Sequence, residues 1–135
     1  MRFYVSIFKN SQITNVTSGP HGTMLSATFE LDGQRFMALN GGPTFTFTPA
    51  ISLFVSCETQ QEVDELWEKL SEGGSKERCG WLKDKYGLSW QVVPTVLGTL
   101  LGDTDAAKVH HVVQAMLKMT KLDIEGLQQA YAEVV

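Results

Sequence analysis

The chain has 135 residues, of which 43% are hydrophobic and 19% are charged, as expected for one soluble globular domain. Its net charge of −4 gives no electrostatic basis for binding nucleic acid or an anionic membrane, and no apolar run is long enough to span a bilayer. The two cysteines, Cys57 and Cys79, do not make a disulfide scaffold, so we expect a reduced, cytoplasmic protein.

The first forty residues are predicted to form one helix followed by three strands. Hydrophobic periodicity indicates the helix, and alternation of apolar and polar residues indicates the strands. Asp32-Gly33 joins the last two strands as a two-residue hairpin, because both central positions of a type I′ turn need positive φ. The predicted ranges are 2–9 for the helix and 12–18, 23–31 and 34–40 for the strands.

A Gly41-Gly42-Pro43 sequence then breaks the chain. Residues 44–48 alternate again, but Pro43 and Pro49 flank them. This segment is therefore either a short edge strand or a loop that carries two aromatic rings. Residues 51–57 are predicted to form the next strand.

A helix is predicted to begin after Thr59, where a capping box is present. The Thr59 hydroxyl can accept from the amide of Glu62, whose carboxylate can reach back. Gly73-Gly74 is expected to end this helix. Its buried face consists of Val63, Leu66, Trp67 and Leu70.

A tight hairpin follows, with strands at 79–85 and 88–93. Asp84 and Gly87 bracket its turn, and Asp84 is expected to stabilise that turn.

After Pro94 the pattern becomes helical, so we expect residues 94–135 to be a helical extension of the domain formed by residues 1–93. Asp123 is the expected N-cap of the last helix. One apolar face holds Val109, Val112, Met116 and Met119, and the other holds Ile124, Leu127, Tyr131 and Val134.

Five segments, spread over nearly the whole chain, resemble one family. They are Phe3–Phe8, Leu39–Pro43, Cys79–Asp84, Gly87–Gln91 and Gln114–Met119. The chain resembles PhnB-like proteins, often labelled demethylubiquinone methyltransferase-like, of the vicinal oxygen chelate superfamily that includes glyoxalases, bleomycin-resistance proteins and extradiol dioxygenases. The resemblance implies an α+β fold of paired βαβββ modules around a cavity, commonly completed in a homodimer.

The chain departs from the family pattern because it starts inside the first helix, so the usual first strand is absent. A shortened gene start or a strand from another molecule would explain this. The uncovered sheet edge would invite a partner strand, so we expect a homodimer.

The resemblance also places Asn40 and Gln91 on strands that line the cavity. Gln91 stands where superfamily members carry a metal-binding Glu, and their first metal ligand lies on the missing strand. An amide is a poor ligand for a divalent cation. We therefore expect no metal, and the sequence indicates no other cofactor.

Four aromatic residues are candidates to line a pocket for a planar apolar ligand: Phe45, Phe47, Trp81 and Trp90. Side chains alternate along a strand, so Trp90 and Gln91 should point to opposite faces unless the strand bulges. The predicted ligand-binding set is Asn40, Phe45, Phe47, Trp90 and Gln91.

The histidines and cysteines give weaker signals. His110 and His111 are adjacent on a helix and cannot point the same way, while His21 lies in a loop, so all three are interpreted as surface residues. Both cysteines are interpreted as small buried hydrophobes, although Arg78 beside Cys79 hints at a reactive thiol.

The predicted function is binding, or turnover, of a small, largely apolar organic molecule without a metal. One alternative is a metal-dependent lyase or dioxygenase of the same superfamily. A second is a methyltransferase, as the family label suggests. That activity typically needs a Gly-rich loop leading into a helix, and Gly41-Gly42-Pro43 is followed by Thr-Phe repeats instead.

Overall fold

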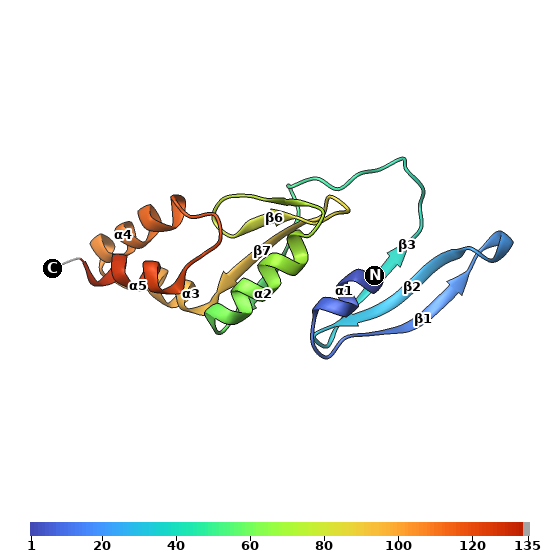
Figure 1. Cartoon of the computed structure of the whole chain (residues 1–135), viewed down its shortest axis with the longest axis horizontal. Helices are drawn as coiled ribbons and strands as arrows, with labels where there is room; N and C mark the ends of the chain where they lie inside the picture. The colour runs from blue at the N-terminus through green and yellow to red at the C-terminus, as the bar shows by residue number, and fades with distance from the viewer. Residues whose placement is uncertain (134–135) are drawn as a thin grey trace. The chain divides into compact units, whose positions relative to one another are not determined.

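The computed structural model describes residues 1–133 (Figure 1). The chain divides into two compact units, Met1–Thr46 and Phe47–Val135. No helix among the described residues has the length and apolar character needed to cross a membrane.

The first unit is a short helix followed by a three-stranded antiparallel sheet in the order β1-β2-β3. Asp32 and Gly33 have φ values of 48° and 80°, which confirms the predicted hairpin turn between β2 and β3. The elements are α1 (Arg2–Ile7), β1 (Gln12–Ser18), the 3-10 turn η1 (Pro20–Gly22), β2 (Met24–Leu31) and β3 (Gln34–Leu39).

The core of this unit lies on one face of β2. Ala27, Phe29 and Leu31 are buried there, at alternate positions. The ring of Phe29 stacks on Phe36 of the neighbouring strand, with ring centroids 5.6 Å apart. Tyr4 is the buried residue of α1.

The second unit begins with a complete βαβββ module, built from β4 (Ser52–Cys57), α2 (Gln60–Ser71), β5 (Ser75–Lys76), β6 (Trp81–Lys83) and β7 (Ser89–Pro94). Its sheet has the order β4-β7-β6-β5, and β4 runs parallel to β7. Within the described chain, the first unit has no strand before its helix. The predicted α+β fold class, with two sheets and a helical C-terminal part, is therefore confirmed.

The segment between β3 and β4 contains no strand, so the Thr-Phe repeats form a loop. Phe45 and Phe47 are 89% and 59% exposed. Of the two predicted alternatives, the loop is therefore correct and the edge strand is wrong. The flanking prolines and the lack of a partner strand explain why no strand forms.

Helix α2 begins at the predicted cap. The Thr59 hydroxyl accepts from the amide of Glu62 at 3.2 Å, but the Glu62 carboxylate accepts from the amide of Glu58, one residue earlier than expected. The helix ends at Ser71, ahead of the glycine pair. Val63, Trp67 and Leu70 are buried on its inner face, and Leu66 is partly buried.

Three helices complete the second unit: α3 (Thr95–Leu101), α4 (Ala106–Leu117) and α5 (Ile124–Ala132). Asp123 accepts from the amide of Gly126, which confirms it as the N-cap of α5. Val134, a member of one of the predicted apolar faces, lies outside the described residues. The helices pack with β7 and the segment before α5 around a buried cluster of Val93, Leu97, Leu100, Val112, Leu122 and Leu127.

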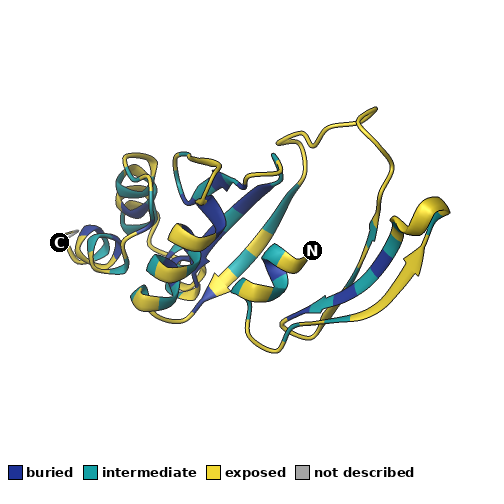
Figure 2. Ribbon diagram, turned by 45° about the vertical axis from the view of Figure 1, so that its right-hand side comes forward, coloured by how far each residue is buried: buried dark blue, intermediate teal, exposed yellow. Residues whose placement is uncertain are grey.

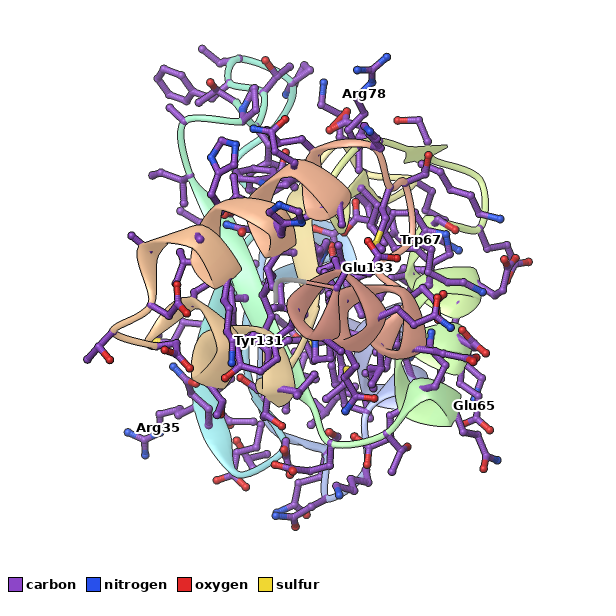
Figure 3. All side chains as sticks on the ribbon, turned by 90° about the vertical axis from the view of Figure 1, so that its left-hand side faces the viewer. Arg35, Glu65, Trp67, Arg78, Tyr131 and Glu133 are labelled. Atoms are coloured by element: carbon purple, nitrogen blue, oxygen red, sulfur yellow. The ribbon has the colours of Figure 1, made fainter. Side chains whose placement is uncertain are left out.

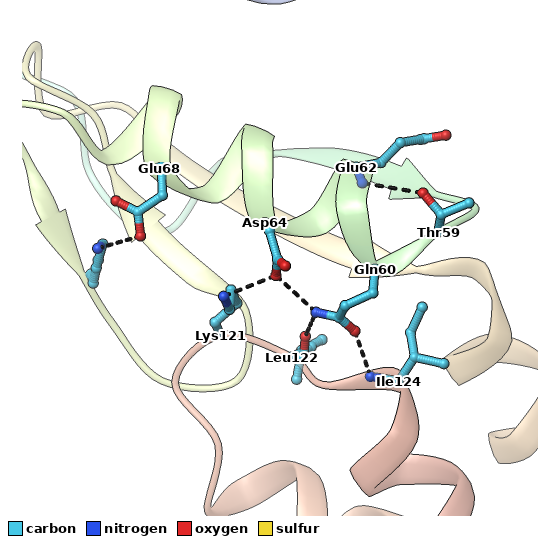
Figure 4. A network of polar contacts seen from close by, with 9 residues as sticks. Thr59, Gln60, Glu62, Asp64, Glu68, Lys121, Leu122 and Ile124 are labelled. Carbon is cyan, nitrogen blue, oxygen red and sulfur yellow. Dashed lines mark hydrogen bonds and ion pairs between the residues drawn. The ribbon is translucent and has the colours of Figure 1, made fainter.

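Gln60 of α2 ties these helices to the module (Figure 4). Its amide nitrogen donates to the carbonyl of Leu122 at 3.1 Å, and its amide oxygen accepts from the amide of Ile124 at 2.8 Å. Lys121 also forms an ion pair with Asp64 at 2.9 Å. These contacts join α2 to the segment that leads into α5, and the domain boundary at residue 93 stays a prediction.

A second polar contact joins α5 to the loop between α3 and α4. Tyr131, which is labelled in Figure 3, donates its hydroxyl to Asp103 at 2.5 Å. This hydrogen bond lowers the pKa of the Asp103 carboxyl and raises that of the Tyr131 phenol. Lys108 of α4 lies 4.7 Å from the centroid of the same ring.

Candidate functional site

The four-stranded sheet has two chemically different faces. Alternation along its strands places Cys57, Leu82, Trp90 and Val92 on one face, where all four are buried. The buried side of α2 packs against this face. Figure 2 colours the residues by burial, and partly buried and exposed residues alternate along β4 before the buried Cys57.

The opposite face of this sheet presents Gln91 between two aromatic rings. Gln91 on the central strand β7 pairs with Phe54 of β4 on one side and with Trp81 of β6 on the other. Directly paired residues have Cβ atoms about 4.5–5.5 Å apart, so the three side chains form a row across the sheet. We call this the aromatic row. Phe54 is 60% exposed and Gln91 is partly buried.

The Gln91 amide is already oriented by a hydrogen bond. Its nitrogen donates to the Ser52 hydroxyl at 2.9 Å. The amide oxygen is therefore presented with a defined direction, which suits recognition of a donor group on a ligand.

Trp90 lies on the buried face of the sheet and Gln91 lies on the other face, as strand alternation predicted. It is 3% exposed, and its indole nitrogen donates to the Asp84 carboxylate at 2.9 Å. Asp84 also accepts from the amides of Tyr86 and Leu88, which confirms its role in the hairpin turn.

The remaining predicted residues fall in both units. Asn40 and Phe45 belong to the first, and Phe47 belongs to the second. The Asn40 side chain donates to the carbonyl of Met24 at 3.3 Å, so its amide helps to hold the end of β3. A cavity shared by Asn40 and Gln91 stays a prediction.

The sequence did not identify Phe54 and Ser52 as candidate site residues. Both lie on the predicted strand 51–57, but only the parallel pairing of β4 with β7 places them beside Gln91. The alternation of Leu53, Val55 and Cys57 with Ser52 and Ser56 was a usable signal, because it places Phe54 on the face of the two serines.

The donor set on this face does not fit a divalent metal ion, although the wider superfamily uses one. Gln91 would offer a single neutral oxygen, and its paired neighbours are aromatic. Within residues 1–133, no three His, Cys, Asp or Glu side chains converge as a metal site.

Cys57 is buried as expected, whereas Cys79 is only partly buried. Burial, with a smaller contribution from the charge of Glu62, raises the pKa of the Cys57 thiol to about 11. This thiol is protonated at neutral pH and is a poor nucleophile. The Cys79 sulfur contacts the carbonyl of Met116 at 3.5 Å.

The βαβββ module and its partner unit define a glyoxalase-like α+β protein. The family described as 3-demethylubiquinone-9 3-methyltransferase matches residues 1–93, and the chain belongs to this PhnB-like family. No curated protein matches the chain.

Two solved structures are similar to this one. The PhnB protein from Bacillus cereus, whose name gives 3-demethylubiquinone-9 3-methyltransferase as a provisional activity, is 39% identical. It aligns over 70% of this chain and 88% of its own, with a TM-score of 0.66. Protein PA1353 from Pseudomonas aeruginosa is 17% identical over 63% of this chain and 79% of its own. Its TM-score of 0.53 shows the fold alone.

Proposed function

We propose that this protein binds a small, largely apolar, planar organic molecule on the face of the second sheet that carries the aromatic row. The observation that carries the proposal is the placement of one oriented amide between two aromatic side chains on adjacent strands. Aromatic surfaces with a few polar groups are typical of small-molecule sites. Phe54 and Trp81 would contact the flat faces of the ligand, and Gln91 would fix its orientation.

A direct test is calorimetric titration with naphthamide, an aromatic ring with a neutral polar head. We expect Gln91→Leu to weaken its binding roughly tenfold, because one hydrogen bond inside a site contributes about 1–1.5 kcal/mol. Phe54→Ala should also weaken it, through the loss of apolar contact area.

Gln128→Leu is a matched control, because Gln128 is an exposed glutamine on α5. It should leave naphthamide affinity unchanged. Amide NMR should locate the largest shifts on β4, β6 and β7. No detectable binding, or equal affinity in the Gln91 and Gln128 variants, would contradict the proposal.

A homodimer is the proposed assembly. β3 is one of the two edge strands of the first sheet, and its Met37 and Leu39 are 76% and 73% exposed. Exposed sheet edges and apolar side chains favour association. We predict that light scattering gives twice the mass of one chain. A single-chain mass at micromolar concentration would refute the dimer.

The runner-up function is a metal-dependent lyase or dioxygenase, and the donor chemistry at Gln91 argues against it. We predict no stoichiometric transition metal in protein purified without chelators, as measured by elemental analysis. About one zinc, iron or nickel per chain, lost in Gln91→Leu, would favour the runner-up instead.

A methyltransferase is supported by the family description alone. The glycines at 41 and 42 lead into a loop rather than into the start of a helix. Binding of a nucleotide-like methyl donor would reverse this assessment. A cytoplasmic location stays a prediction.

A further inference from the structure

A second row of side chains lies beside the aromatic row. Ser89 of β7 pairs with Ser52 of β4 on one side and with Lys83 of β6 on the other. Each is two residues away from its counterpart in the aromatic row, so all three project from the same face. The rows are separated by about 6.6–6.8 Å, the length of two strand residues. We call Ser52, Ser89 and Lys83 the polar row.

Ser89 is the unusual member of the polar row. It is 0% exposed, and its hydroxyl has no hydrogen-bond partner anywhere in residues 1–133. Buried hydroxyls nearly always have a partner, so one that lacks it calls for an explanation such as an absent ligand or water. An alanine at this position would avoid the free-energy cost of burying a hydroxyl that has no partner.

Ser52 has a hydroxyl proton to offer. Its oxygen accepts from the Gln91 amide, which leaves its own O–H to donate elsewhere and strengthens it as a donor. Within the described part of the chain, the Ser52 side chain makes no other hydrogen bond. The polar row therefore holds two hydroxyl donors side by side.

Lys83 adds a positive charge at the edge of the row. Its side chain is 40% exposed, and its ammonium group lies 3.8 Å from the Glu77 carboxylate, at the long limit of an ion pair. Such a loose, partly exposed pair is weak, so the ammonium group can exchange Glu77 for a better-placed anion.

We infer that the polar row binds the negatively charged oxygen group of the ligand. This inference rests on the proposed function, and it specifies the ligand class as a planar aromatic molecule that carries a carboxylate or an equivalent oxyanion. The ring occupies the aromatic row. The oxyanion accepts hydrogen bonds from Ser52 and Ser89 and pairs with Lys83, whose long side chain moves to admit it.

The test compares naphthoate with naphthamide, which share a ring and differ in the charge of the head group. We expect naphthoate to bind the unaltered protein at least tenfold more tightly, as typical of hydrogen bonds to a charged group. Lys83→Gln should remove most of this preference. Glu77→Gln should increase it, because it frees Lys83 from the competing carboxylate.

Two further variants separate a binding role from a structural one. Ser89→Ala should weaken naphthoate binding while leaving the thermal unfolding temperature unchanged or higher, because it deletes a buried hydroxyl with no partner. Lys76→Gln is the matched control for Lys83. Lys76 pairs with Leu82 of the buried face and forms an ion pair with Glu68, so its loss should leave naphthoate affinity unaltered.

The outcomes distinguish this inference from the proposed function. Equal affinities for naphthoate and naphthamide, insensitive to Lys83→Gln and Ser89→Ala, would overturn the polar row while leaving the aromatic row standing. Failure of both compounds to bind would overturn both. If Lys76→Gln reduces the preference for naphthoate as much as Lys83→Gln does, the preference comes from general surface charge. That result would also overturn the inference.

Discussion

Gly74→Ala is expected to destabilise the second unit by about 3 kcal/mol or more, because the new methyl group would overlap main-chain atoms. A Cβ at this position would lie 2.0 Å from the carbonyl oxygen of Lys83 and 2.7 Å from the carbonyl carbon of Asp84. No side-chain rotation relieves such overlap. Strand β6 would have to move away from β5, where Ser75 pairs with Lys83.

Urea unfolding followed by tryptophan fluorescence measures this effect on the second unit alone, since all three tryptophans lie in Phe47–Val135. Gly98→Ala is the matched control. Gly98 is inside α3, and a Cβ there meets nothing within 4 Å. Alanine should raise stability there by about 0.5–1 kcal/mol, through its higher helix propensity. Equal unfolding midpoints for Gly74→Ala and the unaltered protein would contradict the predicted overlap.

Local elements were predictable because their signals lie within a few residues. The Asp32-Gly33 turn, the Thr59 cap and the Asp123 cap each depend on one or two side chains acting on nearby backbone. The strand Gln12–Ser18 has the predicted bounds. The fold class followed from these elements together with the family resemblance.

The site was only partly predictable, because it depends on contacts between distant segments. The sequence indicated Gln91, but the parallel pairing that brings Phe54 and Ser52 beside it joins strands separated by a helix and a hairpin. The unpaired hydroxyl of Ser89 likewise has no local signature, because its burial and lack of a partner depend on tertiary packing.

The main constraint on Gly74 also comes from a contact between distant segments. The glycine pair was interpreted as a helix terminator, and α2 ends ahead of it. The stronger constraint on Gly74 is the close passage of the β6 main chain, which only the folded sheet reveals.

Asp84→Ala is expected to destabilise the second unit by about 3 kcal/mol, because it removes a buried carboxylate that accepts several hydrogen bonds. Asp84 is 2% exposed. It accepts from the amides of Tyr86 and Leu88 at 2.8 and 3.1 Å, and from the Trp90 indole at 2.9 Å. Alanine would leave these three donors without this acceptor, and the turn between β6 and β7 would lose its central support.

Asp84→Asn keeps the shape of the side chain but removes its charge. The remaining oxygen of asparagine can still accept from the two backbone amides. Its amide nitrogen would face the Trp90 indole N–H, so two donors would oppose each other where a donor and an acceptor met before. We therefore expect Asp84→Asn to lose about half as much stability as Asp84→Ala, measured by the same urea unfolding of tryptophan fluorescence. If both variants unfold at the urea concentration of the unaltered protein, the carboxylate does not hold the hairpin. In that case the pairing of β6 with β7 must be maintained by its main-chain hydrogen bonds and by the buried side chains of Leu82 and Trp90.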